Sequence, residues 1–425
     1  MKIAIFHLGF FYSGGGEKLI LEEMRGLKAL GHDVECFAPY VDKDGCFPDS
    51  PEMQTIKRLL PQPPDWLPMK DPLWVLLSCV MIPFLAPRFR QFDVFFGANQ
   101  PGPWFAFVLG RILNKPYVIY LAQPLRTLHP REIDLQNGIR IREGDTRFIN
   151  LMTQAAGWLI DKADRMSVAN SSFVMTNGSY VSNWISEVYG VATVNCPAGC
   201  YPVRGKDLRY RHRRSGSLRF NGDFIPKPFM LLTNRHSPMK RFEYALWAMK
   251  AIGRTNHRIS LVITGQETEY TTLLKYLVAG LGLEEVIHFV GLVTNENLAM
   301  LYGEALLYVY PSPEEDFGMG IVEAMAAGTP VVAWNNGGPT GIVIDRETGF
   351  LIEPYDVDSF TDKMALLSSN PALAESIGRK GHARSESHFS YAAHNRKLEE
   401  TFAEAIEIHQ QESEPDPPLT VRITE

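Results

Sequence analysis

Short apolar runs alternate along this chain with longer segments in which apolar and polar positions follow a helical period. The first run, KIAIFHL at residues 2–8, leads into a glycine-rich turn and then a helix-like pattern at 17–30 that Gly31 ends. Strands separated by helical segments are typical of parallel sheets built from βαβ units. We predict strands at this run and at residues 32–39, 92–98, 116–122, 165–171, 229–235, 259–265, 286–292, 307–312 and 329–335.

The strand pattern lapses around residues 200–224, and we place a domain boundary there. Within this stretch, RGKDLRYRHRR at 204–214 holds six Lys or Arg residues and one Asp, a local charge of +5. Because 425 residues exceed one ordinary hydrophobic core, two doubly wound α/β domains are expected. We predict domains at 1–195 and 196–380, a helix at 381–411 that returns to the first domain, and a disordered polar tail at 412–425.

The net charge, the N-terminus and the cysteines each exclude or favour a class of protein. A net charge of -6 argues against a nucleic-acid binder that works through its overall charge. The N-terminus lacks the apolar core and the small-residue cleavage site of a signal peptide. We therefore expect a cytoplasmic protein, and we interpret its five cysteines as reduced thiols: Cys36, Cys46, Cys79, Cys196 and Cys200.

One apolar stretch, at residues 72–87, resembles a membrane segment. It is shorter than the roughly 20 residues that a bilayer-spanning helix needs, and Pro83 interrupts it. Two alternatives remain, a core helix and a helix lying on the inner face of a membrane. We slightly favour the core helix. Under the second alternative, an anionic membrane surface would be a partner of the protein.

Two loops carry candidate anion-binding groups. Gly15 and Gly16 precede the first helix, where glycines let backbone amides approach a phosphate or a sugar. The loop is not G-x-G-x-x-G, and no acidic residue ends the second strand, so a dinucleotide site is disfavoured. In the second domain, Arg235 ends a strand and Lys240 begins a helix, and together they could hold a diphosphate. The alternative for both loops is an ordinary solvated turn.

The segment PSPEEDFGMGIVEAMAAGTPVVAW at 311–334 adds a third element. Gly318 and Gly320 let the backbone pass close to a ligand, and a helix is predicted from about Met319 to the stop at Gly328. Glu323 lies among apolar neighbours in this helix, and a buried carboxylate needs partners. Vicinal hydroxyls, as on a ribose, would satisfy both of its oxygens, and Glu315 could then meet the reacting sugar.

The same segment, with the GGP and TGFL runs that follow it, closely resembles the E-x7-E region of retaining glycosyltransferase family 4. NRHSPMKRF at 234–242 and GGGEKLILEEMRGLKALGHDV at 14–34 are also similar to segments of that family, and the resemblance covers about residues 1–390. It implies the GT-B fold, in which two Rossmann-like doubly wound domains face a central cleft that holds a nucleotide-sugar.

The family pattern implies a role for each matching residue. Arg235 and Lys240 would neutralise the leaving diphosphate, and Glu315 would contact the donor sugar near its anomeric carbon. Glu323 would bind the ribose. The resemblance requires no metal and no cofactor, and Asp356–Asp358 is better interpreted as a helix cap than as a metal-binding D-x-D. The remaining donor-binding positions are Phe317, Gly318, Met319, Gly320, Gly15 and Gly16, and the possible acceptor or donor contacts are Gln123 and Arg126.

The expected function is transfer of a hexose from a GDP- or UDP-linked donor, with retention, to a glycolipid or polysaccharide precursor. The QPLR segment at 123–126 favours mannose. Ala122 stands where the family often has a His, and His129 is seven residues further on. This departure keeps a second hypothesis open, a catalytically impaired nucleotide-sugar-binding or scaffold protein. A nucleotide-sugar epimerase is a third hypothesis, which the E-x7-E segment disfavours.

Overall fold

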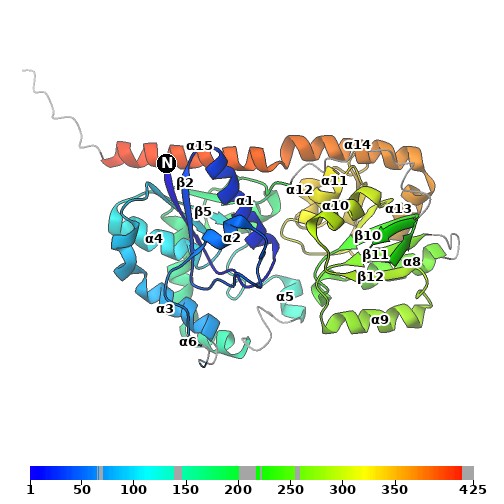
Figure 1. Ribbon diagram of the computed structural model, residues 1–425, viewed down its shortest axis with the longest axis horizontal. Helices are drawn as coiled ribbons and strands as arrows, with labels where there is room; N and C mark the ends of the chain where they lie inside the picture. The colour runs from blue at the N-terminus through cyan, green and yellow to red at the C-terminus, as the bar shows by residue number, and fades with distance from the viewer. Residues whose placement is uncertain are drawn as a thin grey trace, which may run out of the picture.

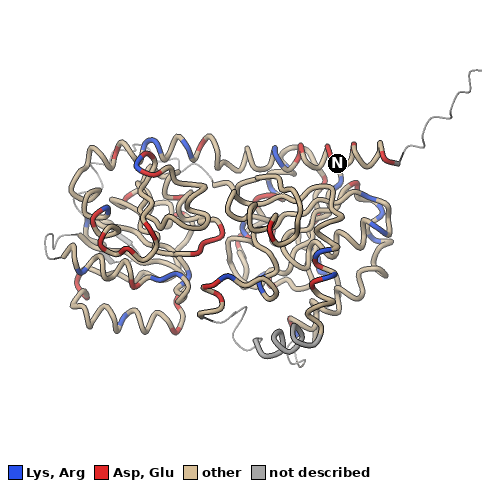
Figure 2. The backbone as a smooth tube through the Cα atoms, turned by 180° about the vertical axis from the view of Figure 1, so that it is seen from behind, with Lys and Arg blue, Asp and Glu red and all other residues tan. Residues whose placement is uncertain are grey.

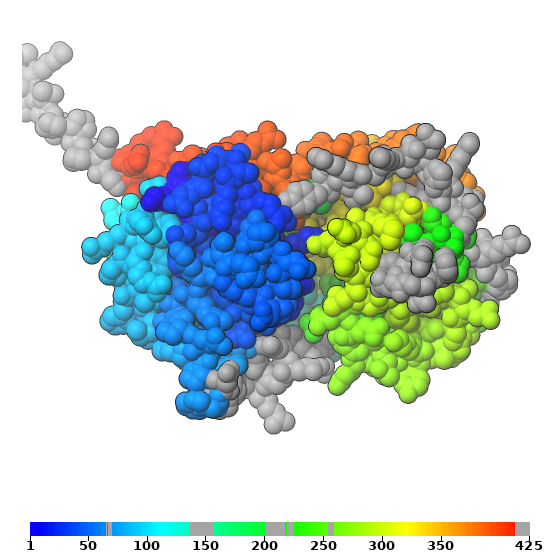
Figure 3. Space-filling view, viewed as in Figure 1, coloured from blue at the N-terminus to red at the C-terminus, as the bar shows by residue number. Residues whose placement is uncertain are grey.

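A computed structural model describes residues 1–64, 66, 70–137, 146–200, 217–220, 223–253 and 259–413 of the chain. It contains two parallel sheets, one in each of two lobes that lie side by side (Figure 1). Helices α14 (Pro371–His388) and α15 (Tyr391–Ser413) run along one edge of both lobes, as the space-filling view also shows (Figure 3). The basic stretch 204–214 and the tail from residue 414 lie outside the described residues.

The N-terminal sheet has seven parallel strands in the order β3-β2-β1-β4-β5-β6-β7. These are β1 (Lys2–His7), β2 (Asp33–Ala38), β3 (Lys57–Arg58), β4 (Val94–Ala98), β5 (Tyr117–Leu121), β6 (Phe173–Thr176) and β7 (Val194–Asn195). The helices of this lobe are α1 (Gly15–Ala29), α2 (Pro51–Thr55), α3 (Lys70–Leu85), α4 (Gly102–Leu113), α5 (Glu132–Asn137), α6 (Thr146–Ala169) and α7 (Ser179–Tyr189).

The C-terminal sheet has six parallel strands in the order β12-β11-β10-β13-β14-β15, and a separate hairpin pairs β8 with β9. The strands are β8 (Ser217–Phe220), β9 (Asp223–Pro226), β10 (Phe229–Thr233), β11 (Ser260–Thr264), β12 (Ile287–Gly291), β13 (Tyr308–Tyr310), β14 (Val331–Trp334) and β15 (Phe350–Ile352). The helices are α8 (Glu243–Gly253), α9 (Glu269–Leu281), α10 (Asn295–Glu304), α11 (Met319–Ala326), α12 (Pro339–Ile342) and α13 (Val357–Ser369). The strand order reverses between β1 and β4 in the N-terminal sheet and between β10 and β13 in the C-terminal sheet. This reversal confirms the doubly wound α/β prediction.

One predicted strand was wrong. Residues 165–171 contain the last turns of α6, and the strand β6 follows from Phe173. Asp164 and Val168, spaced by four residues, are both buried, which is the period of a helix rather than of a strand. The apolar run was too short to distinguish the two.

Pro83 does not end α3, contrary to the sequence prediction. The helix continues through it to Leu85 and then into a 3-10 turn at Ala86–Phe89. Proline has no N–H to donate to the carbonyl four residues earlier, and here the Cys79 carbonyl instead accepts a hydrogen bond from Trp104 Nε1 at 3.2 Å. A neighbouring helix thus provides the hydrogen bond that Pro83 cannot make.

The expectation of a core helix at 72–87 was also wrong. By length and composition alone, the stretch Lys70–Phe89 is long and apolar enough to cross a membrane, and 22% of its most apolar 18 residues are buried. Ser78 and Ile82 face the domain, where α3 packs against α4. The opposite side is a continuous apolar stripe exposed to solvent at Leu76, Leu77, Val80 and Phe84.

Two segments at the junction of the lobes, around Cys200 and around Phe389, are hydrogen-bonded to each other. The Cys200 N–H donates to the Phe389 carbonyl at 2.7 Å. Beyond this point α15 packs against α1, where His394 Nε2 lies 3.0 Å from Glu23 Oε1 in a fully buried ion pair. Although burial opposes its charge, Cys196 and Glu23 raise the pKa of His394 to about 10.

Glu23→Gln should destabilise the protein by about 3 kcal/mol, because it leaves the buried His394 without its counter-charge. The measurement is chemical denaturation at pH 7. Asp33→Asn, in an ion pair whose side chains are more than half exposed, is the control and should cost less than about 1 kcal/mol. If the two variants lost the same free energy of unfolding, the buried Glu23–His394 ion pair would not stabilise the contact between α1 and α15.

Candidate active site

The candidate residues lie where the strand order of each sheet reverses. The glycine loop follows β1, and Asn99 follows the neighbouring β4. In the other lobe, the loop with Arg235 follows β10, and residues 311–318 follow the neighbouring β13. Carboxyl ends of adjacent parallel strands at such a reversal are the usual ligand site of doubly wound sheets.

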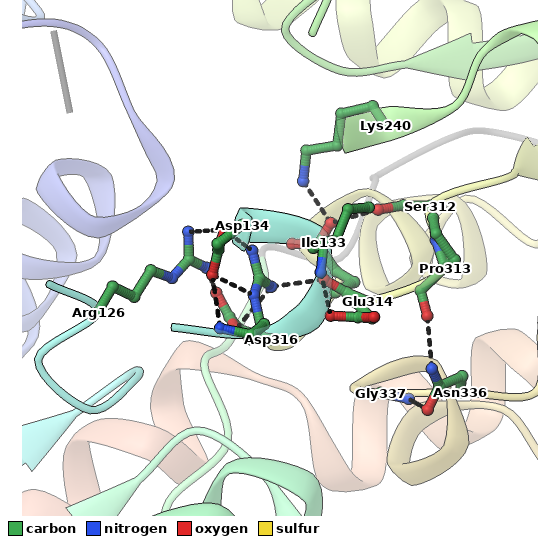
Figure 4. A network of polar contacts seen from close by, with 12 residues as sticks. Arg126, Ile133, Asp134, Lys240, Ser312, Pro313, Glu314, Asp316, Asn336 and Gly337 are labelled. Atoms are coloured by element: carbon green, nitrogen blue, oxygen red, sulfur yellow. Dashed lines mark hydrogen bonds and ion pairs between the residues drawn. The ribbon is translucent and has the colours of Figure 1, made fainter. Parts of the chain in front are cut away.

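Residues Glu314, Glu315 and Asp316, here called the acidic segment, join the two lobes. Each of the three carboxylates has a partner in the protein, and Figure 4 shows Glu314 and Asp316 beside their partners Ile133 and Arg126. Glu314 Oε2 accepts a hydrogen bond from the Ile133 N–H at 3.2 Å, at the start of α5 in the N-terminal lobe. Acidic and basic stretches of the two lobes therefore meet between them (Figure 2).

Glu315 forms an ion pair with Lys240 and accepts a hydrogen bond from Ser312 Oγ at 3.2 Å. Burial alone would raise the pKa of Glu315, but Lys240 outweighs that effect and lowers it to about 2. The carboxylate is therefore ionised throughout the physiological range and is not a proton donor. The structure brings these two predicted catalytic residues together.

Asp316 is held by two arginines of the N-terminal lobe. Arg126 forms an ion pair with one oxygen (Figure 4), and Arg131 Nη1 contacts the other at 3.0 Å. Arg131 also donates to the Glu314 carbonyl and binds Asp134 at 3.1 Å. The predicted donor or acceptor contact at Arg126 is thus engaged in an interlobe ion pair.

Glu323 has both oxygens satisfied by the protein itself. Lys18 Nζ lies 3.0 Å from Oε1, and the Tyr302 hydroxyl donates to Oε2 at 3.0 Å. The helix α11 begins at Met319, as predicted, and its residues from Ile321 to Ala326 other than Glu323 are buried. The partners that this carboxylate was expected to need come from remote parts of the chain, because its apolar neighbours in sequence do not surround it in space. A ribose would have to share Glu323 with Lys18.

Arg235 differs from Lys240 in its surroundings. It is exposed, and among the residues that the structure describes it forms no ion pair within 4 Å. Its charge, together with that of Arg126, acts to lower the pKa of Tyr12, although burial and Glu17 raise it overall. Cations from both lobes therefore lie near Tyr12 in the glycine loop, with the Arg235 guanidinium open to an anion.

The four glycines predicted at the donor site occupy positions that differ in how much space surrounds them and in backbone conformation. A Cβ on Gly15 would meet nothing within 4 Å, and one on Gly16 only Asn99 at 3.9 Å, so space beside both is open to a ligand. Gly318 has φ of +106°, which favours glycine. A Cβ on Gly320 would lie 2.2 Å from the Tyr308 hydroxyl, so protein packing alone requires a glycine at this position.

For three other predicted donor or acceptor contacts, the structure gives the burial of the side chain but, among the described residues, no polar partner at the site. Phe317 is buried and its ring lies 6.2 Å from that of Phe389. Met319 and Gln123 are half-buried. None of these observations tests their predicted contact with a donor.

His129 does not replace the histidine missing at Ala122. His129 Nε2 lies 3.4 Å from Asp161 Oδ1, and its ring contacts Tyr189 edge-on, toward α6 and α7. The Ala122 N–H donates instead to Asn99 Oδ1 at 3.2 Å. This side of the site is lined by amide and backbone groups.

Asp356 caps α13, as predicted, with Oδ1 accepting from the Ser359 N–H at 3.0 Å. Within the described parts of the chain, no group of three or more His, Cys, Asp or Glu side chains is arranged to hold a metal ion.

Sequence reasoning missed Lys18, Tyr302, Arg131 and Glu17. A signal for Lys18 was present, because a cation in the first turn of a helix opposes the helix dipole unless an anion pairs with it. Nothing local marked Tyr302, or the contact of Arg131 with Asp316, since these partners are remote in sequence. Glu17 is buried beneath the glycine loop, and burial raises its pKa to about 7.

Comparison with known proteins agrees with this geometry. Residues 219–384 match the family Glycosyl transferases group 1. Alpha-1,3/1,6-mannosyltransferase ALG2 of Mus musculus is 25% identical over 406 residues, which cover 89% of this chain and 90% of that protein. Sucrose-phosphate synthase from Thermosynechococcus elongatus has a TM-score of 0.74 at 20% identity, covering 96% of this chain and 100% of the other. Anabaena HepE, solved with UDP and glucose, has a TM-score of 0.70 at 17% identity, covering 95% and 100%. The two-domain GT-B fold is confirmed.

Lys240→Met and Arg235→Ala should both lower turnover, by about 100- to 1,000-fold, because each removes a charge from the predicted diphosphate site. Their stabilities should differ. Lys240→Met leaves the largely buried Glu315 without its cation and should cost about 3 kcal/mol, whereas Arg235→Ala at an exposed site should cost about 0.5 kcal/mol or less. Paired denaturation and kinetic assays test this, and a stable, active Lys240→Met protein would contradict it.

Glu17→Gln should raise stability at pH 8 and change it little at pH 5. A pKa raised from 4.5 to about 7 means that stability due to protonated Glu17 is complete below pH 4.5 and lost as pH rises through 7. The glutamine cannot ionise, so the expected gain at pH 8 is about 3 kcal/mol. Denaturation at both pH values measures it, and an equal effect at the two would refute the assignment.

Proposed function

We propose that this protein, an enzyme of the glycosyl transferases group 1 family with the GT-B fold, transfers a hexose from a nucleotide-sugar to a lipid-linked or polysaccharide-precursor acceptor. The observation that carries the proposal is the convergence of Arg235, Lys240, Glu315 and Glu323 from two loops and one helix at the strand-order reversal of the C-terminal sheet. Glycines 15 and 16 face the same region with open space beside them.

The diphosphate of the donor would lie against the open Arg235 guanidinium and the Lys240 ammonium. Glu323 would take the ribose hydroxyls, sharing its carboxylate with Lys18. Glu315, held ionised by Lys240, would accept hydrogen bonds from hydroxyls of the donor sugar. HepE is a protein of the same fold that binds UDP, which makes a UDP- or GDP-linked donor the first class to test.

The proposed reaction retains the anomeric configuration. The bond between the anomeric carbon and the phosphate oxygen breaks, and a bond from the acceptor oxygen forms on the same face of the sugar. The acceptor's proton passes to the departing phosphate oxygen. Arg235 and Lys240 would stabilise the negative charge that develops on the diphosphate, which is the main catalytic contribution of this chain.

Mannose is the hexose that we favour. ALG2, a mannosyltransferase, aligns with this chain over nearly its full length, and the QPLR segment at 123–126 led to the same expectation. Donors carrying mannose or glucose are therefore the two to compare.

The proposed location is the cytoplasmic face of a membrane. The exposed stripe of α3 is apolar from Leu76 to Phe84, and the exposed Arg88 and Arg90 follow it. A helix with one face packed on its domain and the other apolar and exposed is suited to lying in a bilayer interface, with basic residues at anionic headgroups. All five cysteines are free thiols, which agrees with a reducing compartment.

To test the function, the protein is incubated with GDP-mannose or UDP-glucose and a polyprenyl-diphosphate-linked disaccharide. We expect transfer with an axial product linkage, read by NMR. Donor binding without transfer would favour the scaffold hypothesis, and donor conversion without an acceptor would favour an epimerase.

Glu323→Gln should weaken donor binding about 10- to 100-fold, because charge-assisted hydrogen bonds to the ribose are lost. Glu296→Ala, an exposed carboxylate on α10 of the same lobe, is the control. Titration calorimetry with the donor measures both, and an unchanged affinity in Glu323→Gln would remove the ribose contact from the proposal.

The double variant Val80→Asp with Phe84→Asp should abolish cosedimentation with vesicles of three parts phosphatidylcholine to one part phosphatidylserine. Two charges would then sit in the part of α3 that enters the interface. Leu273→Asp with Tyr276→Asp, at equally exposed apolar positions on α9, is the matched control and should bind as wild type. Equal binding by all three proteins would contradict the membrane face.

A further inference from the structure

A pocket of about 290 Å³ lies beside the acidic segment and belongs to none of the groups assigned above to the donor. One wall is a single face of α7, formed by Tyr180, Asn183, Trp184 and Glu187 at helical spacing. Glu132 of α5 and Glu314 form the opposite side. Because Asn183, Glu187 and Glu132 are exposed, the pocket opens to solvent.

The pocket presents two aromatic rings beside oxygen-rich side chains. The rings of Tyr180 and Trp184 have centroids 6.4 Å apart and are inclined at 43°. Aromatic faces pack well against the C–H face of a sugar ring, and their own polar tips remain free to hydrogen-bond. Carboxylates and an amide at the rim accept and donate hydrogen bonds with hydroxyl groups.

The charges in the pocket disfavour a phosphate. Three carboxylates, those of Glu132, Glu187 and Glu314, face one guanidinium, that of Arg131. Arg131 is already engaged by Asp134, by Asp316 and by the Glu314 carbonyl. A neutral ligand with many hydroxyl groups fits this surface, whereas an anionic headgroup would be repelled.

We propose that this pocket binds a neutral sugar unit of the acceptor glycan, one or more units away from the hydroxyl that is glycosylated. The inference rests on the proposed function and adds to it that the acceptor is recognised through carbohydrate. Glu314 lies in the pocket and precedes Glu315, so an acceptor held here reaches the donor sugar along the acidic segment. The volume is at the lower end for small-molecule sites, which suits one or two sugar rings.

Saturation-transfer NMR with α-linked mannotriose and with maltotriose tests the pocket without any donor. We expect one of them to bind the wild type, and Asn183→Ala and Trp184→Ala to weaken binding about tenfold, the scale of a lost ring contact. Trp184→Phe, which keeps a ring, and Trp247→Ala, a half-exposed tryptophan on α8, should bind as wild type. Pyrophosphate should not compete. If neither trisaccharide bound the wild type, or if Trp184→Ala and Asn183→Ala bound as tightly as the wild type, the proposal would be overturned.

Kinetics separate this inference from the function on which it rests. With a glycan acceptor, Trp184→Ala should raise the acceptor KM about tenfold and leave the donor affinity and kcat unchanged. An unchanged acceptor KM in an active enzyme would refute the pocket and leave the transferase intact. A wild type that binds trisaccharide at Trp184 but transfers no sugar would refute the transferase and retain the pocket.

Discussion

The two lobes are tied together by the need to neutralise three consecutive carboxylates in a partly buried joint. Glu314, Glu315 and Asp316 repel one another, and each alone would be costly to remove from water. Lys240 comes from the C-terminal lobe, whereas Arg126, Arg131 and the start of α5 come from the N-terminal lobe (Figure 4). The acidic segment is therefore stable only with both lobes in contact.

This constraint explains why the site has its present charge balance. Lys240 and Lys18 are each paired with a carboxylate of the E-x7-E segment, and Arg235 remains open. The diphosphate of a bound nucleotide would supply a negative partner for Arg235. The ribose of the same nucleotide would bind Glu323 together with Lys18, a residue of the other lobe. Donor binding and lobe contact are in this way linked through the same few side chains.

Local pattern was enough to predict most strands of the two sheets, the start of α11 at Met319 and the helix cap at Asp356, but it missed the edge strands β3, β7 and β15. Contacts between remote segments were not predictable. Tyr302 and Lys18 bind Glu323 from 21 and 305 residues away, and no period or propensity connects them. For the same reason Glu323 looked isolated and α3 looked buried. The family resemblance supplied the roles, and the packing supplied the partners.

The most direct measurement is calorimetric titration of the wild-type protein with UDP, GDP and ADP in turn. The central claim is that one nucleoside diphosphate binds in the region of Arg235, Lys240 and Glu323. We expect one of the three to bind with 1:1 stoichiometry and an affinity that falls as salt is raised, because Arg235 is an exposed cation. If none of the three nucleotides bound, or if all bound alike and weakly, the site would not be a donor site.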